Sequence, residues 1–166
     1  MNHLYLIGFM GSGKSSVAIY LERTHGLARI EMDRDIEAEC GKTIAQIFAE
    51  DGEEFFRQKE TLLLEKIAQR DGLVVSCGGG VPLRKKNVEI MRASGTIVCL
   101  QAPPEVLLKR LRRSHRRPLV EERSEEEIRA LMQEREELYR SVADHVIDVE
   151  GRTIPEIGEE VKTWIR

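Results

Sequence analysis

The segment Gly8–Ser15, with the sequence GFMGSGKS, constrains this chain more than any other feature. It matches the pattern GxxxxGK followed by Ser or Thr, comes directly after the apolar run Leu4–Ile7, and opens a segment with helical periodicity. Gly11 and Gly13 let the backbone wrap closely enough for its N–H groups to point at phosphate oxygens, and the next helix adds its positive N-terminal end. The pattern predicts a strand, a phosphate-binding loop and a helix, with a nucleoside triphosphate as ligand. A glycine-rich turn that matches by chance is the alternative, which the strand–loop–helix context disfavours.

The polar side chains of this loop have separate predicted roles. Lys14 can bridge the β- and γ-phosphates, which makes it a catalytic candidate, and the Ser15 hydroxyl can ligate Mg²⁺, the expected cofactor. The predicted ATP-binding residues of the segment and of the position that follows it are Gly11, Ser12, Gly13, Lys14, Ser15 and Ser16. A guanine-reading NKxD sequence is absent, because neither Asn2 nor Asn87 precedes a lysine, and this disfavours a GTPase.

Short apolar runs predict five strands, at Leu4–Ile7, Ala28–Ile30, Leu73–Val75, Thr96–Leu100 and Val146–Val149. Because these runs are apolar throughout, they suit strands buried on both faces of a parallel sheet. Helical periodicity marks Lys14–Arg23, Ile44–Ala49, Phe55–Gln69, Arg84–Arg92, Pro104–Arg112, Ser124–Ser141 and Ile154–Ile165. The alternation predicts an α/β fold, a P-loop NTPase three-layer sandwich whose five-stranded parallel sheet is flanked by helices.

Length and charge narrow the class of protein. The 166 residues suit a single domain over residues 1–166, and the formal net charge of −3 disfavours a protein that coats nucleic acid. The cysteines form no CxxC pair, and the first apolar segment is too short for a signal peptide or a membrane span. We expect a monomeric, cytoplasmic protein with no nucleic-acid or membrane partner.

Further motifs follow the loop in a fixed order. They are GKTIAQIF at Gly41–Phe48, Gly52-Glu53 leading to FRQKE at Phe56–Glu60, the triple glycine Gly78–Gly80, Arg117-Pro118-Leu119, and Arg135 before Leu138-Tyr139. With the loop, they resemble the shikimate kinases nearly end to end. The resemblance implies a nucleoside-monophosphate-kinase-like fold, dependence on ATP and Mg²⁺, and phosphorylation of the 3-hydroxyl of shikimate, a step of aromatic amino acid biosynthesis through chorismate. One departure is Glu136-Glu137, where members commonly carry a proline.

Shikimate carries a carboxylate and three hydroxyls, so its site needs cations and a hydrogen-bond acceptor. Arg57 and Arg135 are the candidates for the carboxylate, since a guanidinium fork matches it in bidentate geometry, although each alone also suits an exposed helix arginine. Gly78, Gly79 and Gly80 follow a strand at its carboxyl end, where ligands bind in open α/β sheets, and their N–H groups can reach substrate oxygens. A plain loop is the alternative for these glycines.

The acidic segment Glu31–Asp35 is assigned by register. In the family an Ile-Glu pair and the glycine of the GxTIAxIF motif follow the second acid at fixed distances, which makes Asp33 the second acid and Glu31 the first. By this resemblance Asp33 binds a substrate hydroxyl, Glu31 holds Mg²⁺ through water, and Asp35 is a solvated residue near a helix start. Glutamate at position 31 departs from the family's aspartate. Whether Asp33 is a catalytic base or only orients the hydroxyl stays open, because phosphoryl transfer asks more for positioning than for deprotonation.

A basic stretch at residues 109–123 interrupts the rhythm of strands and helices and contains a proline. We expect a mobile lid that closes over ATP and excludes water, since the stretch lacks the aromatic residues on which single-stranded nucleic acid stacks. Arg117 is expected to reach the phosphates as a catalytic cation. By resemblance Arg110 is a second ATP contact, and Arg152 and Pro155 flank the adenine, although Pro155 also suits an exposed turn.

The resemblance also implies substrate-binding helices at about residues 31–62. Two alternatives to a shikimate kinase remain. One is another small-metabolite kinase of the same fold, such as a gluconate kinase, and the other is a non-catalytic nucleotide-binding homologue. Loss of a functional side chain would mark such a homologue, and the sequence retains Lys14, Asp33, Arg57 and Arg135.

Overall fold

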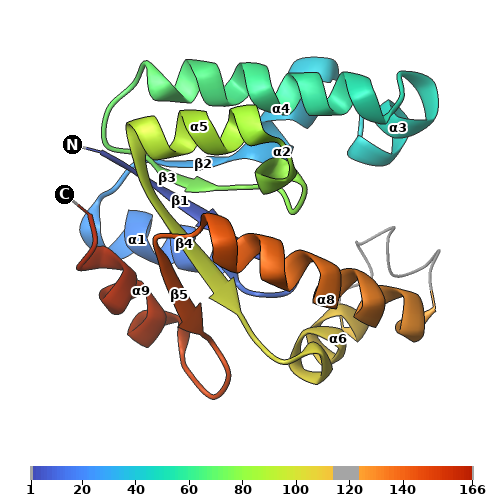
Figure 1. Ribbon diagram of the computed structural model, residues 1–166. Helices are drawn as coiled ribbons and strands as arrows, with labels where there is room; N and C mark the ends of the chain where they lie inside the picture. The colour runs from blue at the N-terminus through green and yellow to red at the C-terminus, as the bar shows by residue number, and fades with distance from the viewer. Residues whose placement is uncertain (1, 114–123, 166) are drawn as a thin grey trace.

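The computed structural model describes residues 2–113 and 124–165. Within these ranges the strands are β1 (His3–Ile7), β2 (Arg29–Glu31), β3 (Val74–Ser76), β4 (Gly95–Gln101) and β5 (His145–Asp148). They form one five-stranded sheet in the order β2-β3-β1-β4-β5, and every neighbouring pair is parallel (Figure 1). This arrangement confirms the predicted sheet.

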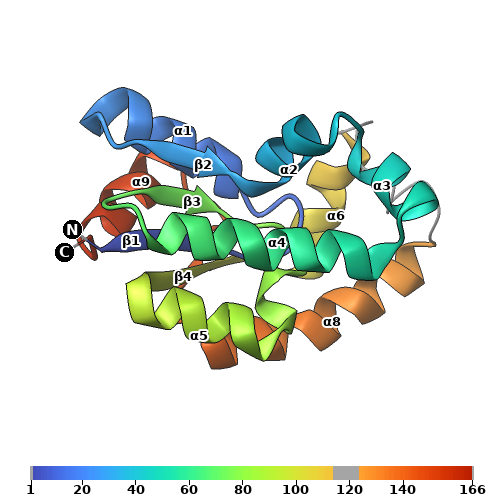
Figure 2. The same ribbon diagram turned by 90° about the horizontal axis from the view of Figure 1, so that it is seen from above.

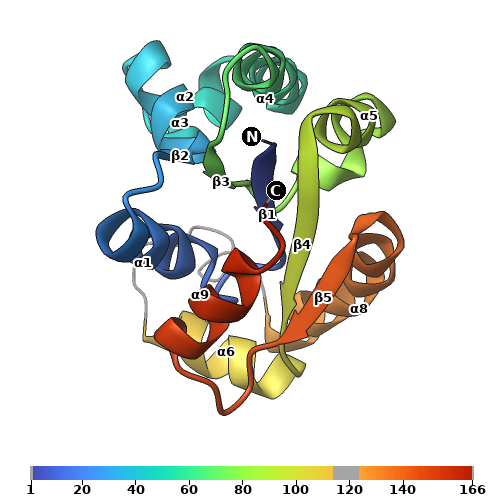
Figure 3. The ribbon, with the colours of Figure 1, turned by 90° about the vertical axis from the view of Figure 1, so that its left-hand side faces the viewer.

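Helices cover both faces of this sheet. They are α1 (Lys14–His25), α2 (Met32–Cys40), α3 (Ile44–Glu50), α4 (Glu53–Ala68), α5 (Lys85–Ser94), α6 (Pro104–Arg112), α8 (Glu125–Val142) and α9 (Ile154–Lys162), with a 3-10 turn, η1 (Val81–Leu83). Figure 3, which looks along the strands, shows α1 and α9 on one face and α4, α5 and α8 on the other. The helices and the sheet therefore form the predicted three layers. None of these described helices is both long enough and apolar enough to span a membrane.

Strand β1 shows why the predicted strands are apolar throughout. Leu4 and Leu6 pack with residues of α1 and α9, whereas Tyr5 and Ile7 pack with residues of α4, α5 and α8 on the opposite face. Each of these four side chains is at most 1% exposed. Because successive side chains of a strand point to opposite faces, a strand that is covered on both sides favours apolar residues at every position.

Side-chain caps fix where two of the helices begin. The Thr43 hydroxyl accepts the N–H of Gln46 at 3.2 Å, and the Gln46 side chain accepts the N–H of Thr43 at 2.9 Å, which is a capping box at the start of α3. The Ser124 hydroxyl accepts the N–H of Glu127 at 3.2 Å, so α8 begins within one residue of its predicted start.

The predicted elements omit one helix and misplace the end of another. Helix α2 begins directly after β2, and only its Met32 and Ile36 are buried, so its apolar periodicity is too weak to be recognised in the sequence. It ends at Cys40 and is capped by Gly41, which adopts a left-handed conformation with a φ angle of 67°. Near the other end of the chain, α9 ends at Lys162 and not at Ile165.

The polar motifs gather at one edge of the sheet. Figure 2 shows the strands running toward the side on which α2, α3 and α6 lie. The loop Gly8–Gly13 follows β1, Glu31 ends β2, and Gly78–Gly80 follow β3, and these three strands lie next to one another. Ligands of open α/β sheets bind at this carboxyl edge.

The lid predicted at residues 109–123 is only partly described. Residues 109–112 form the last turn of α6. Residues 114–123, which include Arg117, lie outside the described residues. The lid and the catalytic role of Arg117 therefore stay predictions.

Candidate active site

The phosphate-binding loop joins β1 to α1 in a conformation that depends on its glycines. Gly8, Gly11 and Gly13 have φ angles of 145°, 81° and 100°, which other residues rarely adopt. Gly8 also has no room for a side chain, because a Cβ atom there would lie 2.4 Å from the carbonyl oxygen of Leu100. The loop therefore lies close against β4. Oγ of Ser12 is buried beside Gly8 and has no hydrogen-bond partner among the described residues.

Two cations reach this loop from different elements. Nζ of Lys14 donates to the carbonyl oxygens of Gly8 at 2.5 Å and Phe9 at 3.2 Å, so its side chain reaches back over the loop. Arg110, on α6, donates from Nη1 to the carbonyl oxygen of Gly11 at 3.0 Å. The structure thus brings both predicted ATP contacts to the loop, where their charge suits the phosphates of a nucleotide.

Ser15 and Glu31, the predicted metal ligands, lie next to each other. Oγ of Ser15 donates to Oε2 of Glu31 at 2.8 Å and lies 3.5 Å from Oγ of Ser76, at the end of β3. All of these groups can coordinate a metal ion through oxygen. Mg²⁺ commonly binds one or two carboxylates together with the phosphates of its substrate. The donor set therefore fits Mg²⁺. Ser16, the next residue of α1, is exposed at this end of the helix.

The acidic residues near the start of α2 differ in their position and exposure. Glu31 is the N-cap of the helix, and Asp33 and Asp35 lie in its first turn. Asp33 is half-buried and faces Gly78, whereas Asp35 is exposed. Of the two aspartates, the structure places Asp33 at the triple glycine.

The triple glycine leaves room for the side chains around it. A Cβ atom on Gly78 would lie 2.7 Å from Oδ1 of Asp33 and 3.1 Å from Oε2 of Glu60. A Cβ atom on Gly80 would lie 2.1 Å from Nη1 of Arg57. Neither glycine has a positive φ angle, so the loop needs glycine for close approach and not for an unusual backbone conformation.

Gly79, the middle glycine, lies against α8. A Cβ atom on Gly79 would lie 3.3 Å from Nη1 of Arg135 and 3.5 Å from the hydroxyl of Tyr139, which donates to the carbonyl oxygen of Gly79 at 2.7 Å. The Arg135 guanidinium lies 5.8 Å from the centroid of the Phe9 ring. Burial raises the pKa of the Tyr139 hydroxyl to about 12, so this group stays a donor at neutral pH. The two predicted arginines and the predicted aspartate thus lie against one loop.

Glu60 is a residue of this site that sequence reasoning missed. Its side chain is fully buried, Oε1 accepts from Nη1 of Arg57 at 2.7 Å, and Oε2 has no hydrogen-bond partner among the described residues. Burial raises the pKa of the Glu60 carboxyl to about 7, against the opposing effect of Arg57 and helped by the nearby charge of Asp33. Phe56, Glu60 and Leu64 lie four residues apart on the buried face of α4. A charged residue within an apolar helical stripe is the signal that identifies it.

Arg152 and Pro155, the predicted adenine contacts, lie at the start of α9. Nη1 of Arg152 pairs with Oε2 of Glu160 at 2.5 Å, and Pro155 lies in the first turn of the helix. The side chain of Ile154 lies 3.6 Å from the position of a Cβ atom on Gly13. This end of α9 therefore borders the phosphate-binding loop, and the contacts of Arg152 and Pro155 with adenine stay predictions.

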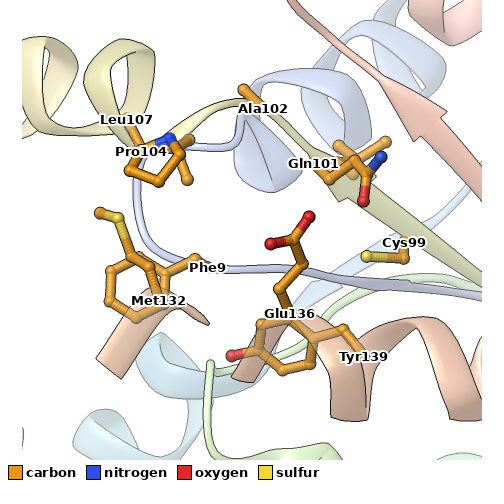
Figure 4. A pocket seen from close by; sticks show the side chains of 10 residues that line it. Phe9, Cys99, Gln101, Ala102, Pro104, Leu107, Met132, Glu136 and Tyr139 are labelled. Carbon is orange, nitrogen blue, oxygen red and sulfur yellow. The ribbon is translucent and has the colours of Figure 1, made fainter. Parts of the chain in front are cut away.

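A small cavity of about 30 Å³ lies between the end of β4, α6 and α8 (Figure 4). Its walls are mostly apolar, and the carboxylate of Glu136 points into it and pairs with Arg140 at 3.0 Å. Helix α8 continues through Glu136 and Glu137 without a break. The departure from proline at this point therefore leaves Arg135 on a regular helix.

Comparisons with known proteins give matches that cover nearly the whole chain. A family model for shikimate kinase (SKI) matches residues 10–166. The shikimate kinase of Pelotomaculum thermopropionicum is 40% identical over 167 residues, covering 100% of this chain and 96% of that protein. The shikimate kinase of Desulforudis audaxviator is 43% identical over 155 residues, covering 93% and 82%.

Solved structures extend the likeness to three dimensions. Shikimate kinase from Acinetobacter baumannii, in complex with shikimate, has a TM-score of 0.90 at 34% identity and covers 98% of this chain and 92% of that one. A gluconokinase from Sinorhizobium meliloti has a TM-score of 0.59 at 22% identity, covers 96% and 89%, and shares only the fold. Because the family model spans nearly the whole sequence and relatives match it throughout, this chain belongs to the shikimate kinase family.

Proposed function

We propose that this enzyme transfers the γ-phosphate of ATP to the 3-hydroxyl of shikimate, giving shikimate 3-phosphate and ADP, a step of aromatic amino acid biosynthesis through chorismate. The observation that carries the proposal is the convergence of Asp33, Arg57 and Arg135 on the Gly78–Gly80 loop. That loop follows β3, the neighbour of the strand that leads into the phosphate-binding loop. The shikimate complex of the related Acinetobacter baumannii enzyme supports the choice of acceptor.

Arg57 and Arg135 hold the shikimate carboxylate in this proposal. They approach the triple glycine from two helices, α4 and α8, so that one anion between them meets two guanidinium groups. Each guanidinium offers parallel N–H donors that match a carboxylate. The N–H groups of Gly78–Gly80 are then in reach of the ring hydroxyls.

Asp33 accepts a hydrogen bond from the hydroxyl that attacks the γ-phosphate. Phosphoryl transfer proceeds through a loose transition state, so holding the hydroxyl in line contributes more than removing its proton early. We therefore assign Asp33 an orienting role, and the proton leaves the hydroxyl as the new P–O bond forms. Lys14 neutralises charge on the transferred group, and Arg117 is proposed to add a second cation.

Ser15 and Glu31 are the residues that would hold Mg²⁺, because their oxygens are adjacent and suit this ion. When bound, Mg²⁺ neutralises charge on the β- and γ-phosphates. Arg110, Arg152 and Pro155 complete the ATP site in this proposal, at the two elements that border the phosphate-binding loop. We place the reaction in the cytoplasm, where ATP is supplied, and expect a monomer, because one chain provides every group.

A coupled assay of ADP release tests this proposal. The purified protein is given ATP and Mg²⁺ together with shikimate, gluconate or a nucleoside monophosphate in separate reactions. We expect turnover on shikimate alone. Turnover on gluconate alone would instead assign a gluconate kinase activity, and intact ATP binding without turnover on any acceptor would indicate a non-catalytic homologue.

A further inference from the structure

Arg29 joins the predicted metal site to α1. Arg29 and Glu31 lie two residues apart on β2, the edge strand of the sheet, so their side chains leave the same face. Nη1 of Arg29 lies 3.3 Å from Oε1 of Glu31, and Nε of Arg29 lies 3.1 Å from Oε1 of Glu22, on α1. Arg29 therefore bridges two carboxylates.

The carboxylate of Glu31 is held at both oxygens. Oε1 faces Arg29, and Oε2 accepts from the Ser15 hydroxyl at 2.8 Å. The side chains of Arg29 and Glu31 are 21% and 14% exposed, so the contact is shielded from most of the solvent. A glutamate has one more rotatable bond than an aspartate, and a second contact is what fixes the direction of its carboxylate.

The charge of Arg29 acts in two opposing ways. A cation close to a metal site repels the metal ion, whereas a donor that orders a ligand carboxylate favours binding. Glu22 pairs with the same guanidinium and offsets its charge, so the repulsion is reduced while the hydrogen bond to Glu31 remains. The ordering effect therefore prevails in this arrangement.

We propose that Arg29 is a positioning residue for the metal site, which fixes Glu31 so that one carboxylate oxygen faces Ser15. The proposal rests on the proposed function, in which Ser15 and Glu31 hold Mg²⁺. The alternative role for Arg29 is a structural ion pair that ties β2 to α1. These two roles predict different effects on metal affinity, because only the first acts through Glu31.

Binding of Mn²⁺ to the enzyme with ADP, followed by the EPR signal of free Mn²⁺, tests the proposal without shikimate and without turnover. We expect Arg29→Met to weaken Mn²⁺ binding by about tenfold, as for other residues that orient metal ligands. Arg29→Lys keeps the charge and loses the guanidinium fork, so its Mn²⁺ affinity should fall between those of the wild type and Arg29→Met. Arg23→Met removes an exposed arginine of α1 with the same change in net charge, and it should leave Mn²⁺ affinity within twofold of the wild type.

A double-mutant cycle separates positioning from a structural role. Once Glu31→Gln has removed the carboxylate, a further Arg29→Met change should weaken Mn²⁺ binding by less than about twofold. An equal loss in both backgrounds, an unchanged affinity in Arg29→Met, or Mn²⁺ binding no tighter than to ADP alone would overturn the proposal. Failure of the wild type to phosphorylate shikimate would overturn the proposed function instead, since the Mn²⁺ titration does not depend on the acceptor.

Discussion

Nη1 of Arg57 lies 2.7 Å from Oε1 of Glu60, and the guanidinium of this pair occupies the space that a side chain on Gly80 would fill. Glu60 is fully buried, so its contact fixes the arginine from within the protein, whereas the contact with exposed Glu53 is longer, at 3.5 Å. Exposed ion pairs contribute little to order, whereas a buried carboxylate holds its partner in one place. Arg57, which we propose binds the substrate carboxylate, is therefore held in position by the protein itself.

Replacement of Glu60 should change how stability depends on pH. Burial raises the pKa of its carboxyl from 4.5 to about 7, so between these values the folded protein holds a proton that the unfolded chain has released. The contribution of Glu60 to the free energy of unfolding therefore falls as the pH rises through this window, by on the order of 3 kcal/mol. Urea denaturation of the wild type and of Glu60→Gln, at about pH 5 and about pH 7.5, measures this fall in the free energy of unfolding. The same pH dependence in both proteins would contradict the buried position of this group.

Gly80→Ala should displace the Arg57 guanidinium. Its methyl group would lie between 2.1 and 2.6 Å from three guanidinium atoms, far inside contact distance. We expect shikimate affinity to fall at least about tenfold while ADP affinity stays within about twofold, since a misplaced bidentate contact loses most of its value. Gly79→Ala is the graded comparison, because its methyl group would lie 3.3 Å from Arg135 and should have a smaller effect. Equal effects of the two changes in calorimetric titrations would argue against this geometry.

Tyr139→Phe removes a donor from the triple-glycine loop. The hydroxyl of Tyr139 donates to the carbonyl oxygen of Gly79 at 2.7 Å, and the side chain is 3% exposed. Loss of this bond leaves a carbonyl oxygen without that donor and should lower the free energy of unfolding by about 1–2 kcal/mol. Chemical denaturation checks the value, and a change below about 0.3 kcal/mol would show that the bond does not contribute.

Lys14→Met should affect nucleotide binding and turnover together. The side chain reaches back over the phosphate-binding loop to the carbonyl oxygens of Gly8 and Phe9, so its charge lies where we propose that the phosphates bind. Loss of one such electrostatic group costs roughly 10²–10³ in kcat. We expect weaker ADP binding in calorimetry alongside this loss. Normal turnover in the coupled assay would remove Lys14 from the mechanism.

The sequence predicts well those features that depend on neighbours in the chain. The phosphate-binding loop gathers its glycines, lysine and serine in Gly8–Ser15, and the apolar run of β1 reflects a strand covered on both faces. Arg57 and Arg135 were found through family motifs, since their residue type alone also suits exposed positions.

Features that depend on distant partners were not predictable in the same way. Helix α2 buries only Met32 and Ile36, and Ile36 packs in a small cluster with α3 and α4 away from the main core, so the apolar pattern of the helix is weak. Glu60 has an ionisable side chain, and most glutamates are exposed to solvent, so its residue type alone does not predict burial. Its role becomes visible only when the fold brings Gly78 and Arg57 against it.

Calorimetric titration of shikimate into the enzyme with bound ADP and Mg²⁺ tests the central claim most directly. We expect saturable one-to-one binding in the wild type and an affinity loss of about a hundredfold or more in Arg57→Ala and Arg135→Ala, with ADP affinity nearly unchanged. Lys59→Ala and Arg129→Ala remove partly exposed cations, paired with Glu39 and Glu105, from the same two helices, α4 and α8, and should bind shikimate as the wild type does. Unchanged shikimate affinity in the two arginine variants, or an equal loss in all four, would contradict the account.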